Sequence, residues 1–526
     1  MEARAKLEFE RHNAKEYRRR LMQGLGRPII SFESNGYRVV AVGNQLRWGK
    51  TWKTFFDFLG DYIKTSLTPD WGNAELKKPL EQRHPLIQWY HMLCTFQRAA
   101  IPNKNGIYDA RMTGAVKAYF SLAYDLYLSA HNAKLQDLLL KRLRNPATFE
   151  GALYEAHVIG CFAKAGFEID FEDEGDSNTT HCEFTAKHPE TGQVFSVEAK
   201  AVTSQSSRAG SSAVPPKIGS KLHSALVKKA KGKRVVFIEM NRADPTRAGE
   251  VPSWEKTVTQ ELRQLEVELT IEGQPAPEAY VFLTNRGFMH ALQGTEFVEF
   301  GIVEGFKIDD FPGGKKPATI RELRQARDKH IEMHWLAKAL EQHQEIPAGF
   351  DDRTPAEAFA EEPVERVRIG DVLLAKDEAG KDVPGVLESA IVMENDKHIF
   401  GTFHLQDGRR VHNTIPMSDT ELAIYKASPS TFFEVIERAS RGLKTPLDYY
   451  DFLAKTYMKA SKEDLLSWMA AMPGFDPEMF KDWTQQQLAE FYCEGMATSM
   501  WQSASQTPPD VRGNDEEEAV GRDEAA

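Results

Sequence analysis

The spacing of apolar residues along this chain changes near residue 146, and the change separates regions of different structure. Between about residues 48 and 145, aromatic and aliphatic side chains recur three and four positions apart, which is the spacing of a buried helix face. Two clusters carry this pattern, and their members are Trp48, Trp52, Phe55, Phe56, Phe58 and Leu59 in the first and Tyr119, Phe120, Leu122, Ala123, Leu126 and Leu128 in the second. We therefore predict a helical N-terminal domain over residues 1–145, whose aromatic side chains form a core rather than a platform for stacked bases.

From residue 146 to residue 345 the pattern predicts a sheet with helices. A helix, a hairpin and a basic helix are followed by two short apolar runs, Val235–Ile238 and Tyr280–Leu283, with a helical stretch near residues 254–265 between them. Buried strands that alternate with helices favour a mixed α/β sheet. A long helix from about Ile320 to His343 is expected to complete this domain.

The remainder of the chain divides into a linker, two structured regions and a tail. Pro, Gly and acidic residues over 346–363 are typical of a linker, and residues 364–417 have the pattern of short strands joined by turns, which predicts a small β domain. Residues 418–502 return to a helical pattern, and the acidic segment 503–526 is expected to be a disordered tail. The predicted fold class is therefore α+β with several domains.

The composition of the 526-residue chain restricts its function classes. No apolar run approaches the roughly 20 residues that span a bilayer, and the charged N-terminus lacks a secretory signal, so we expect no membrane partner. The four cysteines, Cys94, Cys161, Cys182 and Cys493, form no CxxC pair, which argues against a disulfide framework or a zinc knuckle and favours the cytoplasm. The net charge of −11 argues against a uniformly basic nucleic-acid binder, although a local basic track remains compatible with it.

One acidic residue stands out on the first helix of the α/β region. This helix is predicted to begin with Asn145 as N-cap and Pro146 in the first turn, and to end at Gly166. Within it Glu155 lies on the same stripe as three apolar residues, Ala152, Ile159 and Phe162. A carboxylate on an apolar face is costly unless it is paired or bound to a metal, so Glu155 either binds a metal or pairs with a neighbouring Lys or Arg.

The hairpin that follows brings two further carboxylates together. The segment Pro189–Gly192 has strong turn chemistry, and if it forms the loop, Glu183 falls directly opposite Glu198. Directly opposed residues share a face, with Cβ atoms roughly 5 Å apart. Lys200 is two residues beyond Glu198, so it lies on the same face.

This arrangement suits metal-assisted phosphodiester hydrolysis. Two like charges held opposite each other are destabilising, and a divalent cation resolves the conflict. Carboxylate oxygens are hard ligands that suit Mg²⁺ or Mn²⁺. An ammonium such as that of Lys200, beside a metal-bound water, orients the water and stabilises the charge of the phosphorane. The residues therefore predict a site for in-line hydrolysis.

The segments that carry this chemistry resemble a known family. Gly151–Glu155, Ala165–Phe167, Glu183–Phe184 and Val197–Lys200 match, in order and spacing, the landmarks of the PD-(D/E)xK nuclease superfamily over about residues 146–285. The resemblance implies a restriction-endonuclease-like core, with a central sheet flanked by helices, and a metal-dependent nuclease activity. It also implies that Glu183 and Glu198 bind the metal, that Lys200 is catalytic, and that Glu155 supports the metal or its water.

One position departs from the family pattern. The family has an Asp, often after Pro, where this chain has His181-Cys182-Glu183, and Asp176 in the preceding acidic loop is the rival. The hairpin register favours Glu183, because Glu183 and not Asp176 falls opposite Glu198. A Glu-x-Lys element alone occurs on many exposed strands, so a solvated charged hairpin on an inactive domain is the alternative.

A basic track follows the hairpin. The chain contains no Asp or Glu from Ala199 to Ile238, and a helix near residues 217–232 is predicted to turn a cationic stripe outward. The residues that we expect to contact a phosphate backbone are Arg208, Lys217, Lys221, Lys228 and Lys231. The alternative is an ordinary solvated lysine face.

Together these features predict an Mg²⁺-dependent endonuclease that acts on DNA, and the resemblance alone suggests a setting in defence or repair. Two alternatives stay open: a catalytically silent scaffold that binds nucleic acid or assembles partners, and a nuclease that cuts RNA. The N-terminal and C-terminal domains are the regions through which we expect a second copy or a protein partner to bind.

Overall fold

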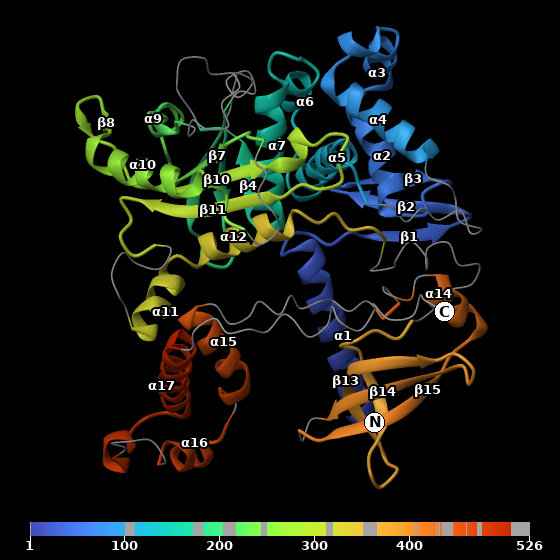
Figure 1. The fold of residues 1–526 in the computed structure, drawn as a ribbon, viewed down its shortest axis with the longest axis vertical. Helices are drawn as coiled ribbons and strands as arrows, with labels where there is room; N and C mark the ends of the chain where they lie inside the picture. The colour runs from blue at the N-terminus through green and yellow to red at the C-terminus, as the bar shows by residue number, and fades with distance from the viewer. Residues whose placement is uncertain are drawn as a thin grey trace, which may run out of the picture. The chain divides into compact units, whose positions relative to one another are not determined.

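Residues 168–306 contain a mixed six-stranded sheet with helices on both faces (Figure 1). The computed structural model describes residues 2–99, 111–171, 182–202, 217–243, 250–311, 319–350, 366–405, 408–427, 429, 432–433, 445–458, 460–470 and 476–506. Packing divides the chain into two units. The larger comprises Met1–Pro312 and Ile331–Val435, and the smaller comprises Gly313–His330 and Ile436–Ala526. The fold class is α+β, as predicted.

The N-terminal region is mainly helical, as predicted, but it also contains a small sheet. Its helices are α1 (Glu2–Gln23), α2 (Phe55–Ser66), α3 (Pro69–Leu76), η1 (Leu80–Gln82), α4 (Pro85–Ala99), α5 (Gly114–Asn132) and α6 (Asp137–Leu143). The antiparallel strands β1 (Ser31–Ser34), β2 (Tyr37–Val42) and β3 (Gln45–Gly49) were not predicted. The core prediction holds for Phe55 and Phe58, which are fully buried, but is wrong for Trp48, which is 66% exposed on β3.

The central sheet has the strand order β11-β10-β7-β6-β5-β4. Its strands are β4 (Glu168–Phe171), β5 (Phe184–Lys187), β6 (Val194–Ala201), β7 (Lys233–Glu239), β10 (Ala279–Arg286) and β11 (Glu299–Phe306). Strands β6, β7 and β10 are parallel, and β4, β5 and β11 run antiparallel to their neighbours. The predicted mixed sheet is therefore confirmed. A two-stranded hairpin, β8 (Thr270–Ile271) with β9 (Gln274–Pro275), and the turn η2 (Gly287–His290) flank β10.

Helices cover both faces of the sheet, and the pleat assigns each strand residue to one of them. Helix α7 (Phe149–Lys164) packs on the face that includes Phe195 and Val197. Helices α9 (Gly219–Leu226) and α10 (Glu255–Glu268) pack on the other face. Because side chains alternate along a strand, Glu198 and Lys200 of β6 belong to the α9 face.

The long helix predicted from Ile320 to His343 is in fact two helices. Helix α11 (Ile320–Lys329) ends at His330, where the backbone leaves the helical region at φ −118°, and α12 (Ile331–Gln342) follows. The two helices belong to different units, because Ile320 packs in the smaller unit whereas Met333 of α12 packs in the core of the larger one. Tertiary packing therefore overrides a continuous helical pattern.

The β-rich region after the predicted linker forms a four-stranded antiparallel sheet, as expected. Its strands, in sheet order, are β12 (Val372–Lys376), β13 (Asp382–Met393), β14 (His398–Leu405) and β15 (Arg410–Pro416). Gly380 has φ +77° in the turn after β12, a conformation that glycine adopts without strain. Helix α14 (Asp419–Ala427) follows the sheet.

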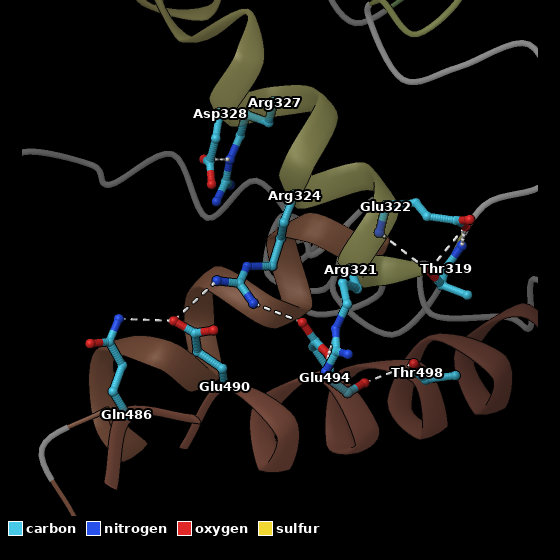
Figure 2. A network of polar contacts seen from close by, with 10 residues as sticks. All are labelled: Thr319, Arg321, Glu322, Arg324, Arg327, Asp328, Gln486, Glu490, Glu494 and Thr498. Atoms are coloured by element: carbon cyan, nitrogen blue, oxygen red, sulfur yellow. Dashed lines mark hydrogen bonds and ion pairs between the residues drawn. The ribbon is translucent and has the colours of Figure 1, made fainter. Parts of the chain in front are cut away.

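The smaller unit is helical, as predicted for the C-terminal region. It contains α11, α15 (Pro446–Tyr457), α16 (Lys462–Met469), η4 (Pro477–Phe480) and α17 (Gln485–Gln506). Figure 2 shows the polar contacts that join α11 to α17. Arg324 Nη1 lies 2.7 Å from Glu494 Oε1, and Arg324 Nη2 lies 3.6 Å from Glu490 Oε1. Arg321 Nη2 lies 3.0 Å from Glu494 Oε2. Helix α17 runs four residues past the predicted boundary at 502, and most of the predicted tail lies outside the described residues. In the described part of the chain, no helix has the length and apolarity needed to cross a membrane.

Candidate active site

The hairpin of β5 and β6 has the predicted register. Phe184 pairs with Val197, and the His188 N–H donates to the Gln193 carbonyl at 3.0 Å, where the turn begins. Glu183 directly precedes the Phe184 pair, and its N–H donates to the Val197 carbonyl at 3.1 Å. The structure therefore brings Glu183 beside Glu198, as the turn chemistry predicted.

A lysine lies between the two carboxylates. Lys200 Nζ is 2.5 Å from Glu198 Oε2 and 3.5 Å from Glu183 Oε1. A second lysine, Lys228, places its Nζ 3.7 Å from Glu198 Oε1. The like-charge conflict that suggested a metal is therefore offset here by two ammonium groups. The Glu198 side chain is only 2% exposed, whereas that of Glu183 is 18% exposed.

Burial and charge both act on this pair. Burial raises the pKa of Glu198, the neighbouring Lys200 lowers it, and the net result is a pKa above the usual range. Burial lowers the pKa of Lys200, but Glu198 and Glu183 raise it by more, so this pKa also lies above its usual value. Lys200 is thus a fixed positive charge at neutral pH and suits electrostatic stabilisation rather than proton abstraction.

Glu155 has a partner of its own. Its Oε2 lies 2.6 Å from Arg142 Nη1 of α6, and its side chain is 6% exposed. Of the two alternatives left open by the sequence, pairing with a cation is what the structure contains. Helix α7 packs on the sheet face opposite to Glu198 and Lys200. A metal-supporting role for Glu155 stays a prediction.

The start of α7 differs from the prediction, whereas its end agrees. The N-cap is Thr148 and the helix begins at Phe149, so Asn145 is not the cap. The Asn145 side chain accepts the Ala147 N–H at 3.0 Å and so stabilises a turn ahead of the helix. Gly166 follows the helix at φ +84°, which is the left-handed conformation of a helix-ending glycine.

The basic helix is shorter than predicted. Helix α9 ends at Leu226, and the chain then turns so that the N–H of Lys231 donates to Ser196 Oγ at 2.9 Å. This contact joins the segment after the helix to β6, and Lys228 and Lys231 lie in that segment, outside the helical stripe. Lys217 and Lys231 are exposed, and Lys221 and Lys228 are half-buried. Arg208 and Asp176 lie outside the described residues.

A different set of side chains, which was not predicted from the sequence, has the geometry of a metal site. One ligand atom each of His157, Cys161 and His343 lies within 4.8 Å of the others, and all three residues are buried. Among the residues that the structure describes, Glu155, Glu183 and Glu198 do not form such a group of three. The one-turn spacing of His157 and Cys161 was the available sequence signal, but His343 is remote in the chain.

A cavity of about 490 Å³ lies elsewhere in the larger unit. Aromatic residues of the N-terminal region line much of it, among them Trp48, Trp52, Trp71 and Tyr90. None of its lining residues belongs to the carboxylate hairpin.

Comparison of the chain with family models, with curated proteins and with solved structures found no match.

Proposed function

We propose that this chain is a metal-dependent endonuclease that hydrolyses phosphodiester bonds in DNA, with Glu183, Glu198 and Lys200 as its active site. The observation that supports the proposal is the adjacency of two carboxylates on neighbouring strands, with one ammonium 2.5 Å and 3.5 Å from them. The mixed sheet flanked by helices agrees with what the PD-(D/E)xK resemblance implies for the core.

The donor set fits a hard divalent cation. Glu183 and Glu198 supply carboxylate oxygens from one face of the hairpin, and the lysines that contact Glu198 are flexible side chains that can move aside. When bound there, Mg²⁺ or Mn²⁺ supplies Lewis-acid polarisation of the phosphate and a more acidic water. Glu183 and Glu198 would hold the ion.

The lysines would act on the phosphate itself. The Lys200 ammonium, which lies beside both carboxylates, would shift to the phosphate and stabilise the negative charge that develops on its oxygens. Lys228, whose Nζ lies 3.7 Å from Glu198 Oε1, would contact an adjacent phosphate. The exposed Lys217 and Lys231 would add backbone contacts that are independent of sequence.

A second candidate function is a catalytically silent scaffold that binds nucleic acid. The observation that favours it is that each of the three predicted acids already has a cation: Lys200 contacts Glu183 and Glu198, and Arg142 contacts Glu155. Such a site is neutralised without a metal.

Plasmid cleavage tests the proposal. Supercoiled plasmid, linear duplex, single-stranded DNA and RNA are incubated with the full chain in Mg²⁺, Mn²⁺ or EDTA, using the wild type, Lys200→Ala and Glu198→Gln. Matched controls are Lys187→Ala and Glu190→Gln, which change exposed residues of the same hairpin. We expect metal-dependent cutting that falls about 100-fold or more in the site variants and not in the controls.

The other outcomes separate the alternatives. Cutting that persists in both site variants would contradict this active site. Salt-sensitive DNA binding without cutting would favour the scaffold, and cutting restricted to RNA would identify an RNase.

A further inference from the structure

The buried cluster on α7 joins side chains from three distant parts of the chain. His157 and Cys161 lie one turn apart on α7, and His343 directly follows α12. Asp125 of α5 contacts His343, with Oδ1 2.5 Å from Nε2. All four are buried, with exposed fractions of 6% or less. This cluster is separate from the carboxylate hairpin.

The spacing of the potential ligand atoms fits a transition metal. Cys161 Sγ and His157 Nε2 are 3.8 Å apart. In a tetrahedral zinc site, bonds of about 2.3 Å to sulfur and about 2.0–2.1 Å to nitrogen place those two atoms about 3.6 Å apart. The observed separation is thus close to that of two ligands on one ion. The one-turn spacing on α7 places both side chains on the same side of the helix.

Unsatisfied polar atoms give a second, independent observation. His343 Nδ1 is buried and has no hydrogen-bond partner among the described residues, and the same holds for Asp125 Oδ2. If Nε2–H of His343 donates to Asp125 Oδ1, the lone pair of this ring resides on Nδ1. A buried acceptor without a partner costs about 1–3 kcal/mol. A carboxylate that orients one ring nitrogen while the other binds a metal is a recurrent arrangement in metal sites.

The backbone of α7 is built to let these groups approach. A Cβ added at Gly160 would lie 2.6 Å from Asp125 Oδ1 and 3.0 Å from His343 Cε1. Any larger residue at this position would therefore displace the Asp125–His343 pair. The glycine is explained by the close contact and not by helix stability, since glycine disfavours a helix interior.

Three cations lie near the cluster, and two of them are paired with carboxylates. Lys117 lies 3.2 Å from Glu299, and Arg286 lies 3.4 Å from Glu239. Lys164 Nζ donates to the Gln342 carbonyl at 2.6 Å. A zinc ion with one thiolate and two neutral imidazoles, beside the carboxylate of Asp125, leaves no net charge in the cluster.

We propose that His157, Cys161 and His343 bind one Zn²⁺ ion, with Asp125 as the residue that positions His343. A thiolate with two imidazoles selects Zn²⁺ over Mg²⁺, because soft and borderline ligands disfavour hard cations. The ion joins α7 to the end of α12 and so acts as a structural cross-link inside the larger unit. Three ligands leave one coordination position of a tetrahedral ion for water or another small molecule.

Metal analysis of the full chain tests this site. The protein is purified without chelator, loaded with Zn²⁺ and freed of unbound metal, and its zinc is measured by mass spectrometry. A parallel sample is loaded with Co²⁺ and its absorption spectrum recorded. We expect one zinc ion per chain, and a near-ultraviolet thiolate-to-cobalt band together with visible bands of tetrahedral cobalt.

Variants locate the ion. Cys161→Ser should abolish the thiolate-to-cobalt band and His343→Gln should lower the zinc content, whereas Cys493→Ser, which changes a buried cysteine of the smaller unit, should alter neither. Wild-type protein that is folded but retains no stoichiometric zinc and shows no thiolate-to-cobalt band would overturn the proposal, even if the Cys161 variant fails to fold. Unchanged zinc in both site variants would overturn it as well.

Discussion

The ion pair between Arg142 and Glu155 allows a quantitative test of what Glu155 does. The two side chains lie 2.6 Å apart, with Glu155 6% and Arg142 29% exposed. Removing one partner of a buried ion pair costs about 3–5 kcal/mol. Because Arg142 still reaches water, we expect Arg142→Met to cost about 3 kcal/mol, at the lower end of that range. This corresponds to roughly a 150-fold change in the unfolding equilibrium.

The assay is a double-mutant cycle. Wild type, Arg142→Met, Glu155→Gln and the double variant are unfolded in urea, and hydrogen exchange of α7 amides assigns the change to the larger unit. If the pair is coupled, the double variant is less destabilised than the sum of the single variants, by about 1–3 kcal/mol. A coupling below about 0.5 kcal/mol would refute the reasoning, since independent sites add to within that margin. Plasmid cleavage by Glu155→Gln then shows whether this acid also serves catalysis.

Three further predictions concern packing and pH. In urea denaturation, Gly160→Ala should lower the free energy of unfolding by about 1–3 kcal/mol, because the added methyl group overpacks the site. The control on the same helix is Gly151→Ala, where an added Cβ meets no atom within 4 Å. This change should raise the free energy of unfolding by up to about 1 kcal/mol, because alanine favours a helix more than glycine does. Phe237→Ala removes a buried ring stacked 4.4 Å from Phe282 and should cost about 3–5 kcal/mol, and a cost below about 1 kcal/mol would contradict that packing. Burial lowers the pKa of His84 from 6.5 to about 4, so the neutral ring favours the folded state above pH 6.5 and this stability is lost as the pH falls towards 4. Unfolding measured at pH 7 and pH 4.5 should show a smaller difference for His84→Gln than for wild type.

The hairpin could be predicted from sequence because its determinants are local. The turn at Pro189–Gly192 sets the register, and the register alone decides that Glu183 meets Glu198. The mixed sheet could also be predicted from the sequence, because its buried strands are short apolar runs between helical segments.

The remaining features depend on contacts that are distant in sequence. In the sequence, nothing distinguishes Arg142 from an ordinary surface arginine. It contacts Glu155 only because α6 packs beside α7. Helix α9 ends at Leu226, and the backbone that follows it donates to Ser196 of β6. The zinc ligands could not be grouped, because His343 joins the cluster only through the packing of α12. The sequence contains no signal for the helix break at His330, because the helical pattern of apolar residues continues through it.

That break has a consequence for how the protein is made. The smaller unit takes α11 from the middle of the chain and its other helices from the C-terminal end. During synthesis, Ile320 and Arg324 therefore lack their partners Tyr450 and Glu494 until residue 494 has left the ribosome. A fragment that ends before residue 436 contains α11 without the helices that it packs against. A fragment that begins at residue 436 lacks α11. A single chain that contains only this unit would have to join its two separated segments.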